Sequence, residues 1–403
     1  MLTDKTIILG VTGGIAAYKA ADLASKLTQD GARVEVVMTE AATKLVAPLT
    51  FHTLTHTQVI TDMFTAPVEY DETHISLSEA ADAVVIAPAT ANTIAKMAAG
   101  MADNMLTGIV LATKAPVIIA PAMNVNMWEN PVTQENVNKL KARGFIIVEP
   151  AYGRLASGKM GRGRLADAEV IHGTIKQVLG RKGDLTRRRI VVTAGGTQEP
   201  VDPVRHIGNR SSGKMGFAAA EAARDRGAEV TLISAPASLP NPTGIEVIHV
   251  QTASQMKDAV ARAVSKASAL IMAAAVADYQ PKSTARSKIK KDADTLTLEL
   301  VRTPDILTEV QGNFIRVGFA AESEDVVANA RKKLQKKNLD LIVANDITSA
   351  ESGFGTDTNK VTIIDNKGKA VELPLLSKRE VAEKILDRVG EMLSPPQHAA
   401  KKR

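Results

Sequence analysis

Runs of consecutive apolar residues, rich in Val and Ile, alternate with helical stretches along the whole chain. Such runs are typical of strands covered on both faces, as in a parallel sheet flanked by helices. The first half has "TIILGVT", "RVEVVMT", "DAVVIAPAT", "APVIIAPAMN" and "FIIVEP". The second half has "RIVVTAGG", "EVTLIS", "IEVIHV", "ALIMAAAVAD", "RVGFAAE" and "LDLIVAND", and then "KVTIIDNKGK", which is typical of a small antiparallel hairpin. The pattern predicts an α/β protein with two doubly wound, Rossmann-like parallel-sheet domains.

The polar segment "GRKGDLTRRR" separates the two halves and is typical of a linker or an exposed domain edge. A chain of 403 residues is also too long for a single core. We therefore predict a first domain over residues 1–185, a second over 186–393 and a basic tail over 394–403. Both halves open with a strand, a Gly-rich turn and an Ala-rich helix, which a shared architecture explains without duplication.

The amino-acid composition excludes several kinds of chemistry and of partner. The chain has no cysteine, which excludes disulfides, thiolate metal ligands and a thiol nucleophile. No apolar run approaches the roughly 20 residues that span a bilayer, and the N-terminus lacks the features of a signal peptide, so we expect a cytoplasmic protein with no membrane contact. The formal net charge is +6 and aromatic residues make up 3% of the chain, which favours small phosphorylated ligands over nucleic acid.

The pattern G-x-x-x-x-G-K-M-G occurs twice, as "GRLASGKMG" and "GNRSSGKMG". A phosphate-binding P-loop needs a Ser or Thr after the Lys, but Met160 and Met215 stand there, and a thioether is a poor ligand for Mg²⁺. The first copy predicts a basic hairpin. The second places Ser211, Ser212 and Gly213 at the start of an Ala-rich helix, where free N–H groups favour an anion. The alternative for this stretch is a serine N-cap.

Several longer motifs carry a family resemblance. "GVTGGIAAYK", "APATANTIAKMAAGMADNML" and "PAMNVNMWENP" resemble the homo-oligomeric flavin-containing cysteine decarboxylases, which are flavodoxin-like. "VTAGGTQEPVDPVRHIGNRSSGKMG", "AAAVADY", "KIKK" and "KNLDLIVAND" are similar to phosphopantothenate–cysteine ligase. In this order they resemble the bifunctional bacterial coenzyme A biosynthesis family, up to about Met392.

The resemblance implies two consecutive reactions. The ligase half would join L-cysteine to 4′-phosphopantothenate, using CTP with Mg²⁺ and passing through an acyl-cytidylate. The flavin half would decarboxylate the product to 4′-phosphopantetheine, with FMN as cofactor. We expect no dedicated protein site for Mg²⁺, since it would arrive with the CTP phosphates. The resemblance also implies self-association, with trimeric flavin domains and dimeric ligase domains.

In the first half, the resemblance implies an FMN site in turns that follow parallel strands, where a ligand sits in such a sheet. Its residues would be Thr12, Gly13, Gly14, Ile15, Ala16, Thr39, Ala89, Thr90, Asn92 and Thr93. His74 would act as the base in the oxidation of the substrate, and Asn124 would hold its carboxylate.

The first G-x-x-x-x-G-K-M-G copy then resembles the flap that covers the substrate. Many relatives have "ACG" there, with a Cys as proton donor, whereas this chain has Ala156, Ser157 and Gly158. Ser is a much weaker acid than Cys, so either Ser157 with a water or a neighbouring group donates the proton, or an oxidised enethiol product escapes. We expect complete decarboxylation. Arg162 and Arg164 on the same flap could hold phosphate.

In the second half, the resemblance implies roles for residues that bind anions and nucleotide. Asn209 would serve the acyl-cytidylate and Lys288 its phosphate, while Arg205, Ser211, Ser212 and Gly213 would bind the substrate. The CTP-binding residues would be Ala273, Ala274, Ala275, Asp278, Lys288, Pro304, Asp305, Ile306, Leu307, Phe319, Lys333 and Lys337. Lys333 and Lys337 are spaced to share one face of a helix, for which a solvated basic face is the alternative.

Two other readings compete with this one. An NAD-dependent oxidoreductase predicts G-x-G-x-x-G and an acidic residue after the second strand, but the chain has "GVTGG" and Thr39, with Glu40 only next to it. A non-catalytic flavin-binding regulator predicts loss of Asn124, Asn209 or Lys288, and all three are present.

Overall fold

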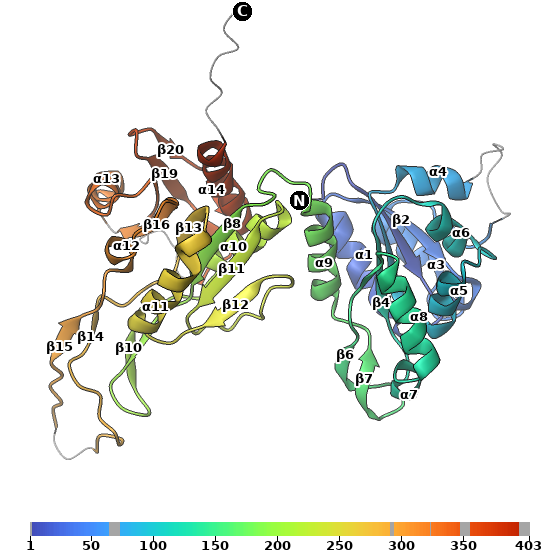
Figure 1. Ribbon diagram of the computed structural model, residues 1–403, viewed down its shortest axis with the longest axis horizontal. Helices are drawn as coiled ribbons and strands as arrows, with labels where there is room; N and C mark the ends of the chain where they lie inside the picture. Colours follow the sequence, from blue (N-terminus) through green and yellow to red (C-terminus); the bar gives the residue numbers. More distant parts are fainter. Residues whose placement is uncertain (1, 64–72, 291–293, 323, 347–354, 395–403) are drawn as a thin grey trace, which may run out of the picture. The chain divides into compact units, whose positions relative to one another are not determined.

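The computed structural model describes residues 2–63, 73–290, 294–322, 324–346 and 355–394. The predicted basic tail, apart from Ser394, lies outside these residues. The chain divides into two compact units, Met1–Leu179 and Gly180–Arg403, each with its own sheet (Figure 1).

The first unit is built on a five-stranded sheet in the order β2-β1-β3-β4-β5. Its strands are β1 (Thr6–Val11), β2 (Arg33–Met38), β3 (Ala83–Ala89), β4 (Val117–Pro121) and β5 (Ile146–Ile147). Every neighbouring pair is parallel. This is the strand order of flavodoxin-like folds, so the predicted doubly wound parallel sheet is confirmed.

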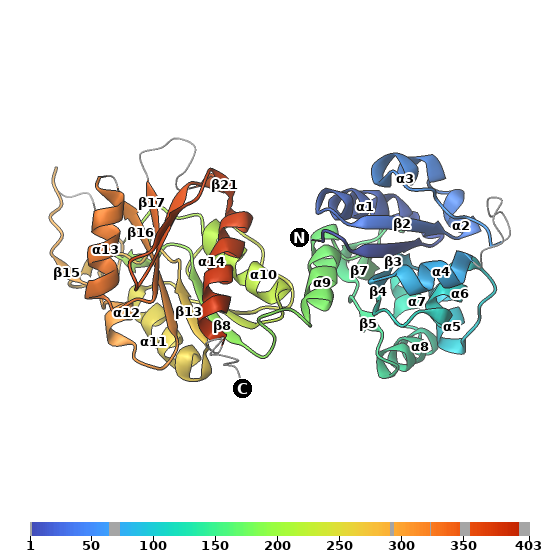
Figure 2. The same ribbon diagram turned by 90° about the horizontal axis from the view of Figure 1, so that it is seen from above.

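Helices cover both faces of this sheet, which explains why its strands are apolar at consecutive positions. Ile7 and Leu9 face one core with α1, α3 and α9, while Ile8 faces the other with α5, α6 and α8. Figure 2 shows α1 and α3 on one side of the strands and α5, α6 and α8 on the other. The helices are η1 (Ile15–Lys19), α1 (Ala20–Gln29), α2 (Glu40–Thr43), α3 (Pro48–Thr55), α4 (Thr73–Ala80), α5 (Ala91–Ala99), α6 (Met105–Ala112), α7 (Val125–Trp128), α8 (Pro131–Ala142) and α9 (Ala168–Gly180).

The second unit has an eight-stranded sheet in the order β12-β11-β8-β13-β16-β17-β19-β20. Its strands are β8 (Arg189–Ala194), β11 (Glu229–Ser234), β12 (Glu246–His249), β13 (Ala269–Met272), β16 (Ile315–Glu322), β17 (Leu341–Asp346), β19 (Val361–Asp365) and β20 (Ala370–Glu372). The six strands from β12 to β17 are parallel and follow the Rossmann order, while β19 and β20 add the predicted antiparallel hairpin at the edge.

Two further cores lie on the two faces of the second sheet. One includes residues of α10 and α14, and the other includes residues of α11, α12 and α13. The helices are α10 (Lys214–Asp225), α11 (Ala253–Ala263), η2 (Val264–Lys266), α12 (Ile306–Glu309), α13 (Val326–Lys336) and α14 (Lys378–Leu393). Short ribbons complete the two units, namely β6 (Ala151–Arg154) with β7 (Met160–Arg164), β9 (Gln198–Pro200) with β10 (His206–Gly208), β14 (Tyr279–Pro281) with β15 (Leu300–Arg302), and β18 (Thr358–Asn359) with β21 (Leu376–Ser377).

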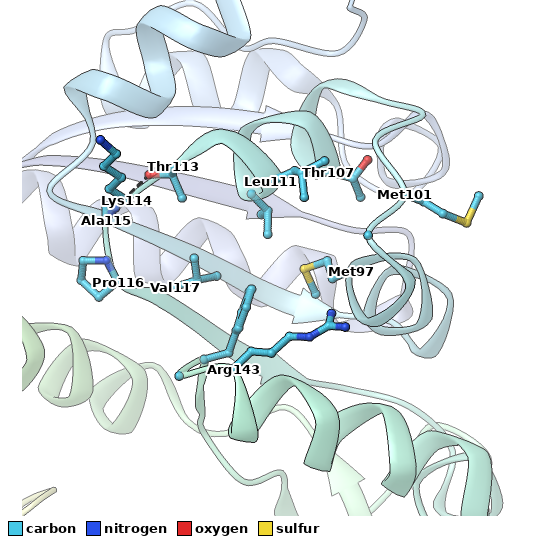
Figure 3. A pocket seen from close by; sticks show the side chains of 14 residues that line it. Met97, Met101, Thr107, Leu111, Thr113, Lys114, Ala115, Pro116, Val117 and Arg143 are labelled. Carbon is cyan, nitrogen blue, oxygen red and sulfur yellow. Dashed lines mark hydrogen bonds between the residues drawn. The ribbon is translucent and has the colours of Figure 1, made fainter.

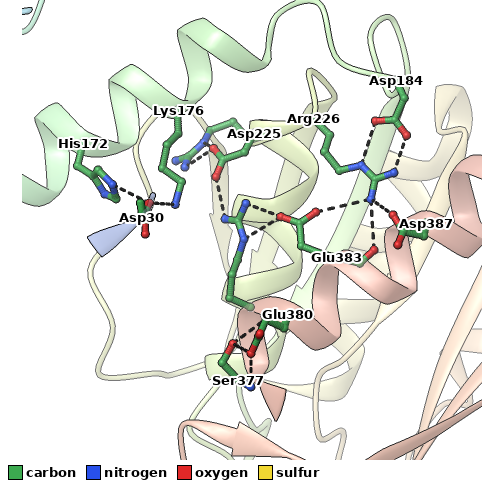
Figure 4. A network of polar contacts seen from close by, with 12 residues as sticks. Asp30, His172, Lys176, Asp184, Asp225, Arg226, Ser377, Glu380, Glu383 and Asp387 are labelled. Carbon is green, nitrogen blue, oxygen red and sulfur yellow. Dashed lines mark hydrogen bonds and ion pairs between the residues drawn. The ribbon is translucent and has the colours of Figure 1, made fainter. Parts of the chain in front are cut away.

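The polar segment between the two halves, expected to be a linker or an exposed domain edge, forms an edge of the second unit. Leu185 is fully buried in the core beneath α10 and α14. Asp184 contacts both arms of the Arg226 guanidinium, at 3.0 and 2.5 Å, and Arg226 also reaches Asp387 of α14 at 2.8 Å (Figure 4). Leu185 and Asp184 thus both hold this polar segment against the second unit.

A second polar network closes the first unit where α1 ends. Asp30 contacts His172 at 2.9 Å and Lys176 at 3.1 Å, both on α9 (Figure 4). The hydrogen bond from His172, together with the charge of Lys176, holds the pKa of the Asp30 carboxyl well below its usual value of 3.8. The carboxylate therefore stabilises the folded unit above about pH 4, and this contribution is lost as the pH falls and the carboxylate becomes protonated.

The melting temperature of the first unit should accordingly fall less between about pH 4.5 and about pH 2 in the Asp30→Asn variant than in the wild type. Trp128, the single tryptophan, lies in this unit, so its fluorescence reports the unfolding of the first unit. Asp22→Asn on the exposed side of α1 is the matched control and should keep the wild-type slope. Equal slopes for wild type and Asp30→Asn would contradict the assignment.

Candidate functional sites

The first candidate site lies where β1 and β3 end. The helices after these neighbouring strands, α1 and α5, pack on opposite faces, and ligands of such sheets bind in the crevice between two turns arranged in this way. The Thr12 hydroxyl is fully buried there, donates to the Pro88 carbonyl at 2.7 Å and accepts from the Thr90 N–H at 3.0 Å. Thr12 therefore joins the two turns that the sequence analysis assigned to a flavin.

Other residues assigned to the flavin gather at the same edge. Thr39 follows β2, and its N–H donates to the Val11 carbonyl at 3.0 Å. A side chain added at Gly14 would lie 3.5 Å from Thr90 Cγ2, so the first and third turns are adjacent. The Thr90 hydroxyl oxygen accepts from the Thr93 N–H at 3.3 Å, so Thr90 caps α5. Among the remaining assigned residues, Gly13 packs against Ala41, Ala89 is buried at the end of β3, Ala16 is half-buried, and Ile15 and Asn92 are exposed.

Thr39 also has a feature that points to a ligand. Its hydroxyl oxygen is buried and has no hydrogen-bond partner among the residues that the structure describes. Leaving a buried polar group unpaired costs about 1–3 kcal/mol, so such groups usually meet a partner. A polar ligand in the crevice would supply that partner.

The first G-x-x-x-x-G-K-M-G copy forms the predicted hairpin, β6 with β7. Its tip carries Ser157, whose hydroxyl oxygen accepts a hydrogen bond from Asn124 Nδ2 at 3.3 Å. Asn124 follows β4, and its other side-chain atom, Oδ1, caps α7 by accepting from the Asn126 N–H at 3.0 Å. The Met123 N–H also donates to the Gly163 carbonyl at 2.9 Å. The structure thus brings together two of the residues assigned to the decarboxylase.

Arg162, Arg164 and His74, which were also assigned to the decarboxylase, make no hydrogen bond to Asn124 or Ser157 in the described part of the chain. Arg164 Nη2 contacts both Asp167 oxygens, at 3.0 and 3.1 Å, whereas Arg162 is exposed on β7. His74 is half-buried on α4, where a side chain added at Gly108 of α6 would lie 3.8 Å from it. Within the described part of the chain, no hydrogen bond joins His74 to Asn124 or Ser157.

The second candidate site lies where β8 and β13 end, the corresponding position of the second sheet. Ala275 donates its N–H to the Gly195 carbonyl at 2.8 Å, and the Ala274 N–H donates to the Thr193 hydroxyl at 3.1 Å. The Thr197 hydroxyl accepts from the Ala277 N–H at 2.9 Å. Threonine hydroxyls therefore join two turns here as well, and these turns carry Ala273, Ala274 and Ala275.

Asn209 and the second G-x-x-x-x-G-K-M-G copy lie beside these turns. Asn209 Nδ2 donates to the Val276 carbonyl at 2.9 Å. Helix α10 begins after Gly213, which has a left-handed backbone (φ 77°) and provides no side-chain cap. Ser211 accepts from the Gly213 N–H at 3.3 Å, so the alternative of a serine N-cap is wrong. Ser212 is half-buried before the same helix start, whose N–H groups remain available for an anion.

Gly216 and Lys214 of the same motif have roles that sequence reasoning missed. A side chain on Gly216 would lie 2.6 Å from the Thr193 carbonyl, so only glycine lets α10 approach β8 this closely. Lys214 Nζ contacts Asp357 at 2.7 Å and the Gly355 carbonyl at 2.9 Å. Neither role has a local signal, because both partners are distant in sequence.

The residues assigned to CTP are partly brought together. Lys337 Nζ contacts Asp305 Oδ1 at 3.1 Å, which links two separate assigned segments. Helix α13 ends at Lys336, and Lys337 is its C-cap. The Lys337 N–H still donates to the Lys333 carbonyl at 3.0 Å, so Lys337 lies one helical turn after Lys333, as its spacing predicts. The others include Asp278, which is exposed, Phe319, which is half-buried on β16, and Pro304, Ile306 and Leu307, which lie at the start of α12.

Arg205, which was assigned to substrate binding, forms an ion pair with Asp202 near Lys288, a contact that nothing in the sequence indicates. Arg205 was expected to bind substrate, but its guanidinium contacts Asp202 Oδ2, at 3.0 Å from Nε and 2.6 Å from Nη2, and the Ile289 carbonyl at 2.8 Å. Lys288 is exposed next to Ile289.

A pocket of about 430 Å³ lies elsewhere in the first unit (Figure 3). Its lining includes Met97 of α5, Leu111 of α6, Arg143 after α8, and Lys114 and Pro116 just before β4. It therefore opens at the amino end of β4, whereas the predicted flavin residues lie at the carboxyl ends of the strands.

The described residues lack two further kinds of feature. They contain no group of three or more His, Asp or Glu that could hold a metal ion. None of their helices is long and apolar enough to cross a membrane.

Comparison with known proteins agrees with the two-unit organisation. The family descriptions that match are "Flavoprotein" over residues 1–180 and "DNA/pantothenate metabolism flavoprotein C-terminal domain" over residues 185–393. The coenzyme A biosynthesis bifunctional protein CoaBC of Bacillus subtilis (strain 168) is 47% identical over 97% of this chain and 98% of its own length. The chain belongs to the bifunctional coenzyme A biosynthesis family.

Another member of this family and two solved structures are also similar to this chain. The CoaBC protein of Mycobacterium tuberculosis (strain ATCC 25618 / H37Rv) is 43% identical over 97% of both chains. The crystal structure of the C-terminal domain of a CoaBC protein is 41% identical and covers 52% of this chain and 98% of its own, with a TM-score of 0.46. A mutant PPC decarboxylase complexed with pantothenoylaminoethenethiol is 33% identical and covers 43% and 96%, with a TM-score of 0.41.

The Thr12→Val variant tests the joint between the two turns of the first site. It leaves the Pro88 carbonyl and the Thr90 N–H without a partner in a buried position, so the free energy of unfolding of the first unit should fall by about 2 kcal/mol. Urea unfolding followed by Trp128 fluorescence measures this. Thr28→Val on α1 is the control and should change it by less than about 0.5 kcal/mol. Equal losses would show that Thr12 has no special role.

Proposed function

We propose that this chain catalyses two consecutive steps of coenzyme A biosynthesis. It joins L-cysteine to 4′-phosphopantothenate in a CTP-dependent reaction, and it decarboxylates the product to 4′-phosphopantetheine with FMN. The observation that carries this proposal is the similarity over 97% of the chain to relatives named as bifunctional coenzyme A biosynthesis proteins. The two crevices, one in each unit, support it because each holds residues suited to one reaction.

The residues of the first crevice fit FMN. The hydroxyl of Thr39, which is unpaired among the described residues, offers a hydrogen bond to a polar cofactor, and the turns that carry Gly14 and Thr90 lie next to each other. The family description "Flavoprotein" over residues 1–180 supports the same cofactor. When bound, FMN supplies a two-electron acceptor and donor, which amino-acid side chains cannot provide.

The hairpin tip supports a role in decarboxylation. Asn124 would hold the carboxylate that leaves as CO₂. Ser157 accepts its hydrogen bond from Asn124, so its own hydrogen remains available for donation to the substrate carbon. His74 would take the proton lost from the substrate thiol. We infer that His74 of one protomer serves the site of another in a trimer, which is consistent with its position on α4.

The second crevice suits the formation of an amide from a carboxylate. An oxygen of the 4′-phosphopantothenate carboxylate attacks the α-phosphorus of CTP, and pyrophosphate leaves. The amine of cysteine then attacks the acyl carbon, and CMP leaves with the bond electrons. The N–H groups at the start of α10, with Asn209, Lys288 and Lys337, would stabilise the anionic groups. Mg²⁺ arriving with CTP would neutralise phosphate charge.

The proposal also covers the assembly of the protein and its location in the cell. We infer dimers of the ligase half, since the family builds sites across subunits. A cytoplasmic location follows from the substrates, because CTP and 4′-phosphopantothenate are highly charged and do not cross membranes unaided.

The deciding experiment supplies the purified protein with 4′-phosphopantothenate, L-cysteine, CTP and Mg²⁺. Pyrophosphate and CO₂ are followed separately, and we expect both. Absence of pyrophosphate would refute the ligase assignment. Pyrophosphate without CO₂ would leave the ligase and refute the decarboxylase.

Anaerobic turnover with mass spectrometry tests Ser157. The wild type should release 4′-phosphopantetheine, whereas Ser157→Ala should accumulate a product lighter by two hydrogens because the returning hydride lacks its proton. Ser157→Cys should speed the last step, since a thiol is the stronger acid. The lighter product from the wild type would instead show that the chain stops at the enethiol. Ala156→Gly, next to Ser157 on the same tip, is the control and should keep the wild-type product.

The Thr39→Val variant tests the FMN site. Loss of one hydrogen bond should raise the Kd for FMN roughly tenfold. The melting temperature of the FMN-free protein should stay the same or rise slightly, because the variant removes an unpaired buried hydroxyl. Quenching of FMN fluorescence gives the Kd. Thr43→Val on the neighbouring helix α2 is the control, and a Kd raised equally in both variants would contradict the assignment.

A further inference from the structure

We propose that Asp202 is a positioning residue that holds the segment carrying Lys288 against the β9–β10 hairpin. Residues 284–290 are called the Lys288 segment below. The inference rests on the proposed ligase function, in which Lys288 acts on phosphate. It assigns a task to a buried carboxylate that the reaction itself does not use.

Asp202 lies in the turn between β9 and β10, and its side chain is 0% exposed. Oδ1 accepts from the N–H groups of Val204 and Arg205, both at 2.8 Å. Oδ2 accepts from Arg205 Nε and Nη2 and, at 3.1 Å, from the Ile289 N–H. The Arg205 guanidinium, with these N–H donors, holds the pKa of the Asp202 carboxyl far below its usual range, so the group is charged.

The Lys288 segment is bound to the hairpin on both sides of Lys288. Upstream, the Thr284 hydroxyl donates to the Pro200 carbonyl at 3.1 Å, and the Ala285 N–H donates to the Val201 carbonyl at 3.0 Å. Downstream, Ile289 donates its N–H to Asp202 and accepts from Arg205 through its carbonyl at 2.8 Å. Lys288 is the residue next to this downstream anchor.

The same hairpin carries Asn209. It follows β10 directly, four residues after Arg205, which corresponds to roughly 13 Å along a strand. Its side chain binds the Val276 carbonyl at 2.9 Å, which fixes that end of the hairpin to the second crevice. The hairpin therefore carries Asn209 after β10, and its turn anchors the segment that carries Lys288.

This arrangement gives Arg205 a different task from the one expected. Two of its donors contact the buried carboxylate, and one of these also reaches the Ile289 carbonyl. A buried charge pair with one partner removed is costly, so the Asp202 carboxylate and the guanidinium depend on each other. Direct binding of substrate by Arg205 remains a distinct outcome of the test.

A double-mutant cycle between Asp202→Asn and Lys288→Gln tests the proposal. Asp202→Asn should slow amide formation roughly tenfold in the wild-type background, but by less than about threefold when Lys288 is already Gln. The KM for CTP should change little. Equal fold losses in both backgrounds would overturn the proposal and would favour a direct role of Arg205 in binding substrate.

Glu199→Gln is the matched control. Glu199 is an equally buried carboxylate on β9, but it accepts from the Ala253 N–H at 2.9 Å, away from the Lys288 segment. Its effect should be the same in both backgrounds. If Asp202→Asn fails to fold, Thr284→Val loosens the upstream anchor without touching the carboxylate and should couple to Lys288 in the same direction.

Limited trypsin digestion gives a readout that does not depend on activity. The Lys288 segment contains cleavage sites at Arg286, Lys288 and Lys290. Asp202→Asn should raise the rate of cleavage there severalfold, and Glu199→Gln should not. Unchanged cleavage would overturn the proposal. If the wild type released no pyrophosphate, the ligase function would be refuted, but the digestion would still test whether Asp202 anchors the Lys288 segment.

Discussion

Both candidate sites depend on the hydrogen bonds of buried threonine hydroxyls between two strand ends. Where neighbouring parallel strands send their helices to opposite faces, the turns have no helix to close the gap between them. In the first unit Thr12 joins the turns after β1 and β3. In the second unit Thr193 and Thr197 join the turns after β8 and β13. These hydrogen bonds fix the two turns of each candidate site relative to each other.

Much of the fold could be predicted from the sequence. Consecutive apolar positions in β1 and β8 indicate strands covered on both faces, and the structure has helices on both faces of each sheet. The errors came where tertiary contacts outweigh local pattern. Leu185 packs a segment with the composition of a linker into the second core, and Gly213 takes the cap position that one alternative gave to a serine. The hydrogen bond from the Ile289 N–H to Asp202 had no local signal, because the two residues are 87 positions apart.

The repeated pentapeptide SGKMG shows the limit of local sequence most clearly. In the first unit it lies in the β6–β7 hairpin, and its serine accepts a hydrogen bond from Asn124. In the second unit the same five residues open a helix, and the lysine binds Asp357. Five identical residues thus adopt two structures, because the residues around them differ. The chemistry of each copy follows from its neighbours.

The position of Leu185 has a consequence for how the chain could be divided. A cut after Leu179 would release a flavin unit and leave the connecting segment on the second core. A cut after Leu185 would instead remove a fully buried side chain from that core and leave an apolar gap beneath α10 and α14. If these two units were ever exchanged between genes, the usable joint would be the short stretch before Leu185, although the residues after it look more like a spacer.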